Sequence, residues 1–196
     1  MDDDLRPLHR RALEIAGEHV DAIDASDLTK PTPCDRWTLA DLLAHMIGQH
    51  DGFALAVRAG SAPEAAYAPV PFSPERWSSS VATILAAFDG AGIDDTAVLI
   101  EIAPTPLPLS LVVGAQLLDT IVHTWDVARS LGRWYEPPDE LATAVVELAT
   151  LVPEDPDRSG SGLPFGPSRP AVGSPWQRAL ARLGRDPRHP DERSEA

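Results

Sequence analysis

The sequence has little of three things that mark common functional classes: cysteine, basic charge and long apolar runs. Cys34 is the only cysteine in 196 residues, which excludes an internal disulfide and a zinc site built from paired cysteines. The formal net charge is -14, and Lys30 is the only lysine, so general attraction to nucleic acid or to an anionic membrane is not expected. Any bound metal must therefore be held by histidine and carboxylate side chains.

Apolar runs are too short for a membrane anchor. No stretch approaches the roughly 18 consecutive apolar residues of a spanning helix, and the chain begins with acidic residues where a secretory signal would be basic and then apolar. We therefore expect a cytoplasmic protein that acts on a small-molecule substrate, with no nucleic acid or membrane partner. The length suits one domain, which we place at residues 1–184, and the polar tail at 185–196 is expected to be disordered.

Apolar residues recur at helical spacing over most of the chain, and prolines and glycines separate the helical stretches. The loop at 60–72 contains three prolines and is expected to cross over between two helices. The β-rich segment that starts at residue 96 is followed by three more prolines, which allow only an extended segment or a short β-hairpin near 96–108. We therefore predict an all-α fold whose helices cover approximately residues 5–23, 39–59, 74–90, 109–131, 138–151 and 176–183.

Two of these helices carry the strongest candidate for a functional site. Asp119 and His123 are four residues apart, so their side chains share one helix face and can bind one ion. His45 lies among apolar residues of the second helix, as His123 does in the fourth, so both imidazoles should face inward. Three protein ligands would leave an open coordination position, as in catalytic zinc sites. The alternative for each histidine separately is a core side chain bonded to a carbonyl or carboxylate.

The remaining histidines have weaker claims to a site. His50 is five residues from His45, about 140° around the helix, so we expect it either to be solvated or to support a metal ligand from behind rather than bind the ion itself. We predict surface positions for His9, His19 and His189, whose neighbours are largely charged or polar.

Other side chains near the candidate ligands have two interpretations. Cys34 is expected to be a partly buried structural thiol, because no sequence pattern marks it as a nucleophile. Tryptophans could line a ligand cavity, although core packing is their commoner fate. Asp126 and Arg129 could support the metal ligands or form a surface ion pair. The tryptophans in question are Trp37, Trp125 and Trp134.

The segments 33–46 and 119–129 together resemble the actinobacterial DinB-like proteins, a group that includes the metal-binding domain of mycothiol-dependent maleylpyruvate isomerase. The segment 183–187 is similar to the end of one uncharacterised subgroup. This resemblance implies a four-helix bundle with a long crossover, and the helix predicted at 176–183 adds a short C-terminal helix to it. It also implies a divalent ion, usually zinc with nickel as the alternative, held by one histidine of the second helix and an acid-xxx-His pair. These positions correspond to His45, Asp119 and His123.

The resemblance further implies a low-molecular-weight thiol, mycothiol, as co-substrate. A thiol bound to the metal would be deprotonated and would attack an electrophile, so no protein nucleophile is required. The family's acid is commonly glutamate, and the shorter Asp119 would place the ion nearer the helix or require a bridging water. The isomerase also has a second carboxy-terminal domain that we do not recognise here, so maleylpyruvate isomerisation itself is not expected.

Three functional hypotheses follow from the sequence. The first is a metal-dependent thiol transferase, or a related enzyme, of unknown substrate. The second is a non-catalytic module that binds a metal or a small ligand. The third is a metal-free structural bundle, and self-association into a homodimer through bundle faces is compatible with each of the three.

Overall fold

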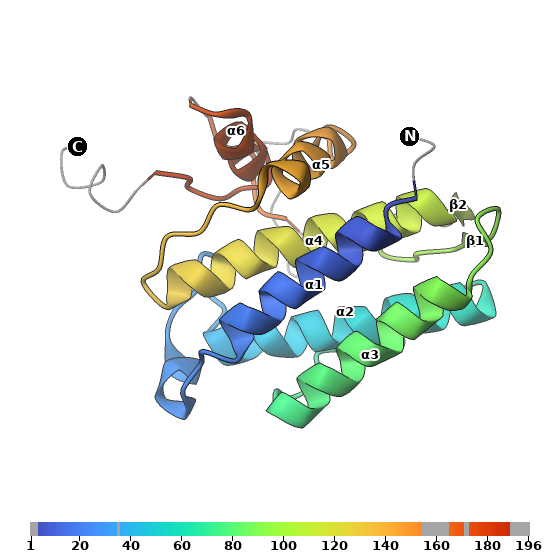
Figure 1. Ribbon diagram of the computed structural model, residues 1–196, viewed down its shortest axis with the longest axis horizontal. Helices are drawn as coiled ribbons and strands as arrows, with labels where there is room; N and C mark the ends of the chain where they lie inside the picture. Colours follow the sequence, from blue (N-terminus) through green and yellow to red (C-terminus); the bar gives the residue numbers. More distant parts are fainter. Residues whose placement is uncertain (1–3, 35, 154–164, 171–172, 189–196) are drawn as a thin grey trace.

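The computed structural model describes residues 4–34, 36–153, 165–170 and 173–188 (Figure 1). Within these residues the predicted all-α fold is confirmed, and each predicted helix lies within a few residues of its expected bounds. Thr38 and Ser73 cap the second and third helices through their side chains. The helices are α1 (Arg6–Val20), α2 (Leu39–Ala59), α3 (Pro74–Gly90), α4 (Leu109–Ser130), α5 (Asp139–Ala149) and α6 (Pro175–Arg182).

The first four helices form the bundle that carries the candidate site. Helix α1 packs beside α3 and α4, and α2 packs beside the same two helices, so α1 and α2 occupy opposite corners (Figure 1). Helices α2 and α3 run in the same direction, which requires the chain to return along the bundle between them (Figure 1). The predicted crossover at residues 60–72 makes this return and contains the 3₁₀ turn η2 (Glu64–Tyr67).

The crossover lies directly on α2 because two glycines leave room for it. A Cβ atom at Gly48 would lie 2.4 Å from the carbonyl oxygen of Ala68, and one at Gly52 would lie 2.3 Å from the ring of Tyr67. The backbone N–H of Val70 donates a hydrogen bond to the carbonyl of Ala44 at 3.0 Å. Residue size on α2 therefore determines where Tyr67 sits.

The short β-hairpin is also confirmed. Strands β1 (Thr96–Ala97) and β2 (Leu107–Pro108) pair antiparallel just before α4 begins. Beyond the bundle, α5 packs on α4, and α6 packs on α5 (Figure 1). None of the described helices is long and apolar enough to cross a bilayer.

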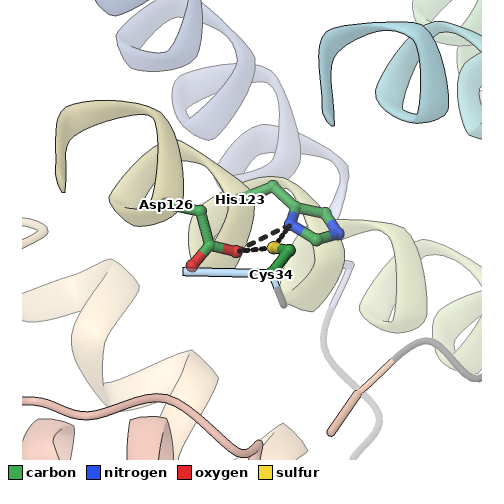
Figure 2. A group of neighbouring side chains, drawn as sticks. All are labelled: Cys34, His123 and Asp126. Carbon is green, nitrogen blue, oxygen red and sulfur yellow. Dashed lines mark hydrogen bonds and ion pairs between the residues drawn. The ribbon is translucent and has the colours of Figure 1, made fainter. Parts of the chain in front are cut away.

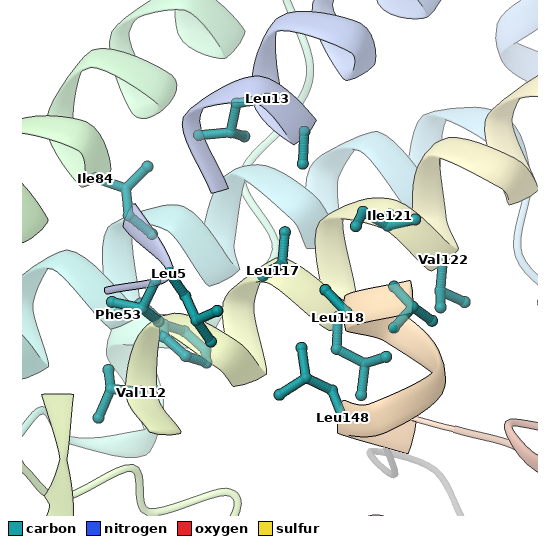
Figure 3. Close-up of a cluster of buried hydrophobic side chains, with 14 of the residues drawn as sticks. Leu5, Leu13, Phe53, Ile84, Val112, Leu117, Leu118, Ile121, Val122 and Leu148 are labelled. Carbon is teal, nitrogen blue, oxygen red and sulfur yellow. The ribbon is translucent and has the colours of Figure 1, made fainter. Parts of the chain in front are cut away.

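The apolar core extends through the bundle to α5. Leu13, Ile84, Leu117 and Val122 are each less than 3% exposed and pack together with side chains of α2 and α5 (Figure 3). Burial of side chains like these contributes about 1.5–3 kcal/mol each to folding. Because α5 joins this core, it belongs to the same packed unit as the bundle.

Two predictions about histidines are wrong. His9 is fully buried and its Nε2 lies 3.2 Å from Oε1 of Gln116, while His50 is 1% exposed and its Nδ1 lies 3.0 Å from Oγ of Ser80. The sequence assigned their helix faces to solvent, but α3 and α4 cover those faces. His19 is half-buried, and His189 lies outside the described residues.

The prediction for the tail is wrong at its first residue. Arg185 is 5% exposed, and its Nη2 donates a hydrogen bond to Oδ2 of Asp126 at 2.8 Å. The described part of the chain therefore continues to pack through Arg185, because an ion pair with α4 holds it. Residues 189–196 of the predicted tail lie outside the described residues.

Candidate metal centre

Helices α2 and α4 bring His45, Asp119 and His123 together. Asp119 and His123 are one turn apart on α4, and His45 faces them from the neighbouring α2. Oδ1 of Asp119 lies 3.3 Å from Nε2 of His123 and 3.8 Å from Nε2 of His45. One potential ligand atom from each of the three lies within 4.8 Å of the others. The three residues selected from the sequence are thus neighbours in space.

The donor set has the chemistry that a divalent ion requires. Nε2 of His45 and Nε2 of His123 are buried, and neither makes a hydrogen bond of acceptable geometry to a described residue, although both lie within ion-pair distance of Asp119. Ligand atoms about 2.0–2.1 Å from a tetrahedral zinc ion lie about 3.4 Å apart. The two distances to Asp119 are near this value, so the short aspartate reaches both imidazoles.

The other nitrogen of His123 is held by a second carboxylate. Nδ1 of His123 lies 2.9 Å from Oδ2 of Asp126, one helical turn further along α4 (Figure 2). Because the fully buried Asp126 accepts a hydrogen bond from Nδ1–H, Nε2 is directed toward Asp119 and His45. Carboxylates that accept the second N–H of a metal-bound histidine fix its tautomer and ring orientation. Asp126 therefore orients the imidazole rather than forming the surface ion pair considered from the sequence.

Arg185 completes this arrangement from the far end of the chain. Its guanidinium donates to both carboxylate oxygens of Asp126, at 2.8 and 3.3 Å, and its Nη2 lies 3.3 Å from Sγ of Cys34. The Cys34 thiol in turn donates to Oδ2 of Asp126 at 3.0 Å, and the side chain is half-buried as predicted (Figure 2). Cys34, His123 and Asp126 also have the spacing of a metal cluster, but the adjacent guanidinium opposes a second cation there.

Charge pairing dominates the electrostatics of the site. Burial alone would raise the pKa of Asp119, but the neighbouring His123 and His45 hold it well below its usual range. Burial likewise favours a raised pKa for Asp126. The charges and hydrogen bonds of Arg185 and His123 outweigh burial, so the pKa of Asp126 is strongly lowered. The pKa of His123 is raised well above its ordinary value because its carboxylate partners overcome the effect of burial. Both carboxylates are therefore anionic at neutral pH, as metal ligation and its support require.

Two of the three candidate ligands line a large cavity. His45 and Asp119 line a hollow of about 1010 Å³, which is enough for a drug-sized molecule. Most of its walls are apolar, with a few polar side chains among the lining residues. Gln49, Glu101 and Tyr67 are among them.

The tryptophans divide between cavity and core. Trp37 lines the cavity, and its ring centroid lies 4.8 Å from that of His45. Trp125 is 1% exposed and belongs to the core, where the guanidinium of Arg129 lies 5.6 Å from its ring centroid. Trp134 is 40% exposed and lies against the same guanidinium. Of these three tryptophans, only Trp37 therefore lines the cavity, which was one of the two positions considered from the sequence.

Several residues of the site were not selected from the sequence. Gln49 lies four residues after His45 on the same face of α2, so helical spacing could have identified it. Arg185 falls in the segment 183–187, whose resemblance to related chain ends was noted, but no local pattern indicated its pairing with Asp126. Cys34 and Glu101 lie in loops, where side-chain direction does not follow from spacing.

Comparison with known proteins agrees with this geometry. Residues 9–128 match the family described as the mycothiol maleylpyruvate isomerase N-terminal domain, and this segment contains all three candidate ligands. An uncharacterized protein of Mycobacterium tuberculosis, from strains CDC 1551 / Oshkosh and ATCC 25618 / H37Rv, is 26% identical over 179 residues. That match covers 90% of this chain and 95% of the relative.

Two solved structures share the fold. The crystal structure of a histidine-to-alanine mutant of mycothiol-dependent maleylpyruvate isomerase aligns with a TM-score of 0.57 at 15% identity, and a second crystal structure of that isomerase aligns with 0.53 at 13%. Each alignment covers 74% of this chain and 68% of the isomerase. Since the family match spans more than half of the sequence, the chain belongs to the mycothiol maleylpyruvate isomerase N-terminal domain family.

Proposed function

We propose that this protein binds one divalent ion, zinc in the first instance, through His45, Asp119 and His123. We further propose that it uses the ion to transfer a low-molecular-weight thiol, mycothiol, to an electrophilic small molecule. The observation that carries the proposal is the pair of buried Nε2 atoms without hydrogen-bond partners that converge on one oxygen of Asp119. That convergence occurs at the wall of a cavity large enough for both reactants.

Each residue contributes a separate part of the chemistry. A divalent ion bound here would lower the pKa of a coordinated thiol and hold it as the thiolate. Three protein ligands leave a coordination position free, and His45 and Asp119 line the cavity from which a thiol would approach. Asp126 accepts a hydrogen bond from Nδ1 of His123, so Nε2 is the nitrogen that would release its proton and bind the ion.

The proposed reaction forms a carbon–sulfur bond, breaks the sulfur–hydrogen bond of the thiol and breaks one bond of the electrophile. The thiol releases its proton to water, and an electron pair of its sulfur forms a carbon–sulfur bond to the electrophilic carbon. With an aryl halide, the carbon–halogen bond breaks and the halide leaves with its electron pair. With an epoxide, a carbon–oxygen bond breaks and the ring oxygen takes a proton from water. With an enone, the carbon–carbon π bond breaks and the α-carbon takes a proton from water. Trp37, packed on His45 at the cavity wall, provides an apolar surface that limits access of water to the sulfur.

The family supports the thiol part of the proposal. The solved structures that share the fold are named as mycothiol-dependent, and the chain belongs to the family of their N-terminal domain. Isomerisation of maleylpyruvate is not part of the proposal, because the shared region covers 68% of the isomerase chain.

A conjugation assay tests the proposed activity. Zinc-loaded protein would be mixed with mycothiol and, in turn, an aryl halide, an enone and an epoxide, and loss of free thiol would be followed against a protein-free control. We expect acceleration with at least one electrophile, abolished by Asp119→Asn and kept by the matched variant Asp94→Asn at an exposed position. Zinc binding without acceleration for any pair would contradict the transferase and favour a non-catalytic binding module.

A further inference from the structure

The cavity runs along two helices away from the candidate metal site. His45, Gln49 and Phe53 follow each other at four-residue intervals on α2 and all line it. Asp119 and Leu111 line it from α4, eight residues apart. Eight residues of helix span about 12 Å, so the cavity extends well beyond the reach of one coordinated sulfur. The additional length is available to a second molecule.

The polar groups of the cavity include one hydrogen-bonded pair and one phenol without a partner among the described residues. The buried side chain of Gln49 donates a hydrogen bond from Nε2 to Oε2 of Glu101 at 3.1 Å. Because Glu101 is exposed, this pair marks the entrance to the cavity. Tyr67 is 3% exposed, and its phenolic oxygen has no hydrogen-bond partner among the described residues. A buried hydroxyl without a partner is costly, and a ligand oxygen would satisfy it.

Tyr67 can act as a hydrogen-bond donor over the whole physiological pH range. Burial, assisted by the charge of Glu101, raises the pKa of Tyr67 to about 12. The phenol therefore remains neutral and keeps its proton. A carbonyl or similar neutral oxygen would be a suitable acceptor.

The charges at the cavity are all of one sign. Glu64, Glu101 and Asp119 line it, whereas no lysine or arginine is found among its described lining residues. Three carboxylates exceed the charge of a single divalent ion, and a bound thiolate would add a further negative charge. A dianionic ligand would thus meet no counter-charge from the described walls and would lose its hydration on entry.

We propose that the cavity selects an uncharged, largely apolar small molecule with a neutral oxygen acceptor, and disfavours carboxylate-bearing ligands. The apolar length that runs from the metal site toward Phe53 and Leu111 holds the body of this molecule, and Tyr67 binds its oxygen. In the proposed thiol transfer this molecule is the electrophile, so the inference rests on the proposed function for the reaction. The binding preference itself depends only on the cavity.

Two dyes that differ by one sulfonate test this preference. N-phenyl-1-naphthylamine is uncharged, and 8-anilino-1-naphthalenesulfonate has the same ring system with a negative charge. Their fluorescence would be titrated with the full-length protein stripped of metal by a chelator, at pH 8 because burial raises the pKa of Glu101 and an alkaline pH favours its anionic form. We expect the uncharged dye to bind about tenfold more tightly than the sulfonate. Equal binding, tighter binding of the sulfonate or no binding of either dye would overturn the proposal.

Variants show whether the dyes occupy this cavity. Glu101→Lys should tighten sulfonate binding by about tenfold and change binding of the uncharged dye by less than about threefold. Glu136→Lys makes the same charge change at an exposed residue outside the cavity lining and should leave both affinities within about twofold. Leu111→Trp should weaken both dyes by filling the cavity. A dye preference that Glu101→Lys does not alter would contradict the proposal.

The measurement is independent of the proposed catalysis. Repeating the titrations with zinc-loaded protein should preserve the order of the two affinities, whereas a reversal would overturn the preference. Failure of the conjugation assay with an intact dye preference would remove the transferase and leave the binding site. A working conjugation assay with no dye preference would support the transferase and overturn the proposed ligand preference of the cavity.

Discussion

Asp126 accepts a hydrogen bond from Nδ1 of His123 at 2.9 Å, on the side of the ring opposite the candidate metal position. The same carboxylate binds Arg185, which lies 59 residues further along the chain. This relationship connects the end of the packed structure to a proposed metal ligand. Substitutions of Asp126 or Arg185 can therefore test the support of the site while leaving the three candidate ligands unchanged.

Asp126→Asn should weaken metal binding without removing a ligand. The amide can still accept a hydrogen bond but loses the charge that favours the correct orientation of His123, and such changes typically cost about 10–100-fold in metal affinity. The zinc dissociation constant would be measured by competition with a chromogenic chelator, with Asp94→Asn as the control. An unchanged dissociation constant would show that Asp126 has only a structural role.

Arg185→Met should destabilise the fold much more than the same change in an exposed arginine. The substitution leaves the buried Asp126 carboxylate without its main counter-charge, and removing one partner of a buried ion pair costs about 3–5 kcal/mol. Arg188 pairs with Asp186 at the surface, where such pairs contribute about 0–1 kcal/mol, so Arg188→Met is the matched control. Urea unfolding measures both free energies. Equal effects of the two substitutions would count against the buried connection.

Gly48→Ala should disrupt the crossover on α2. The added methyl group would lie 2.4 Å from the carbonyl oxygen of Ala68, so either the helix or the crossover must move. We expect a loss of about 1–3 kcal/mol in the free energy of unfolding, together with weaker binding of the uncharged dye because Tyr67 shifts. Gly17→Ala on α1 meets no atom within 4 Å and should raise stability by up to about 1 kcal/mol. A neutral effect of Gly48→Ala would contradict the close contact.

The free energy of unfolding should decrease as the pH is lowered from about 6.5 to 4, because of two buried histidines. Burial, with a smaller effect from the charge of His9, lowers the pKa of His50 to about 3, and burial lowers that of His9 to about 4. The unfolded chain therefore binds more protons than the folded protein in this range, so stability is lost as pH falls. Each histidine contributes a slope of up to about 1.4 kcal/mol per pH unit.

Replacement of each histidine separates these contributions. His50→Gln and His9→Gln should each make the dependence of unfolding free energy on pH shallower by nearly one histidine's slope between pH 6 and 5, and the double variant by nearly two. Urea unfolding at several pH values provides the measurement. Slopes identical to that of the unsubstituted protein would mean that the histidines become protonated without unfolding.

The sequence predicted the bundle and the candidate ligands for the same reason. Asp119 and His123 are one helical turn apart, and the apolar residues around His45 indicate an inward face, so local spacing was sufficient. The fold comparison confirms the helical architecture. Metal ligation by these residues stays a prediction, although they lie together in the structure.

The features that could not be predicted from the sequence depend on contacts between segments that are distant along the chain. His50 points away from His45 as its spacing requires, but α3 covers that face, so the interior replaces the expected solvent. Arg185 and Cys34 are 151 residues apart and meet only because α4 offers Asp126 to both. No periodic pattern specifies such a meeting, because neither residue lies within a helix.

Zinc titration of chelator-stripped protein tests the central claim most directly. Bound metal per chain would be measured by calorimetry and elemental analysis for the unsubstituted protein, for His45→Gln and for Asp119→Asn, with circular dichroism to verify folding. We predict one zinc ion per chain, and at least about hundredfold weaker binding in either folded variant, since a tetrahedral site loses one of three protein ligands. No stoichiometric binding by the unsubstituted protein, or equal binding by the variants, would contradict the assignment of the metal centre.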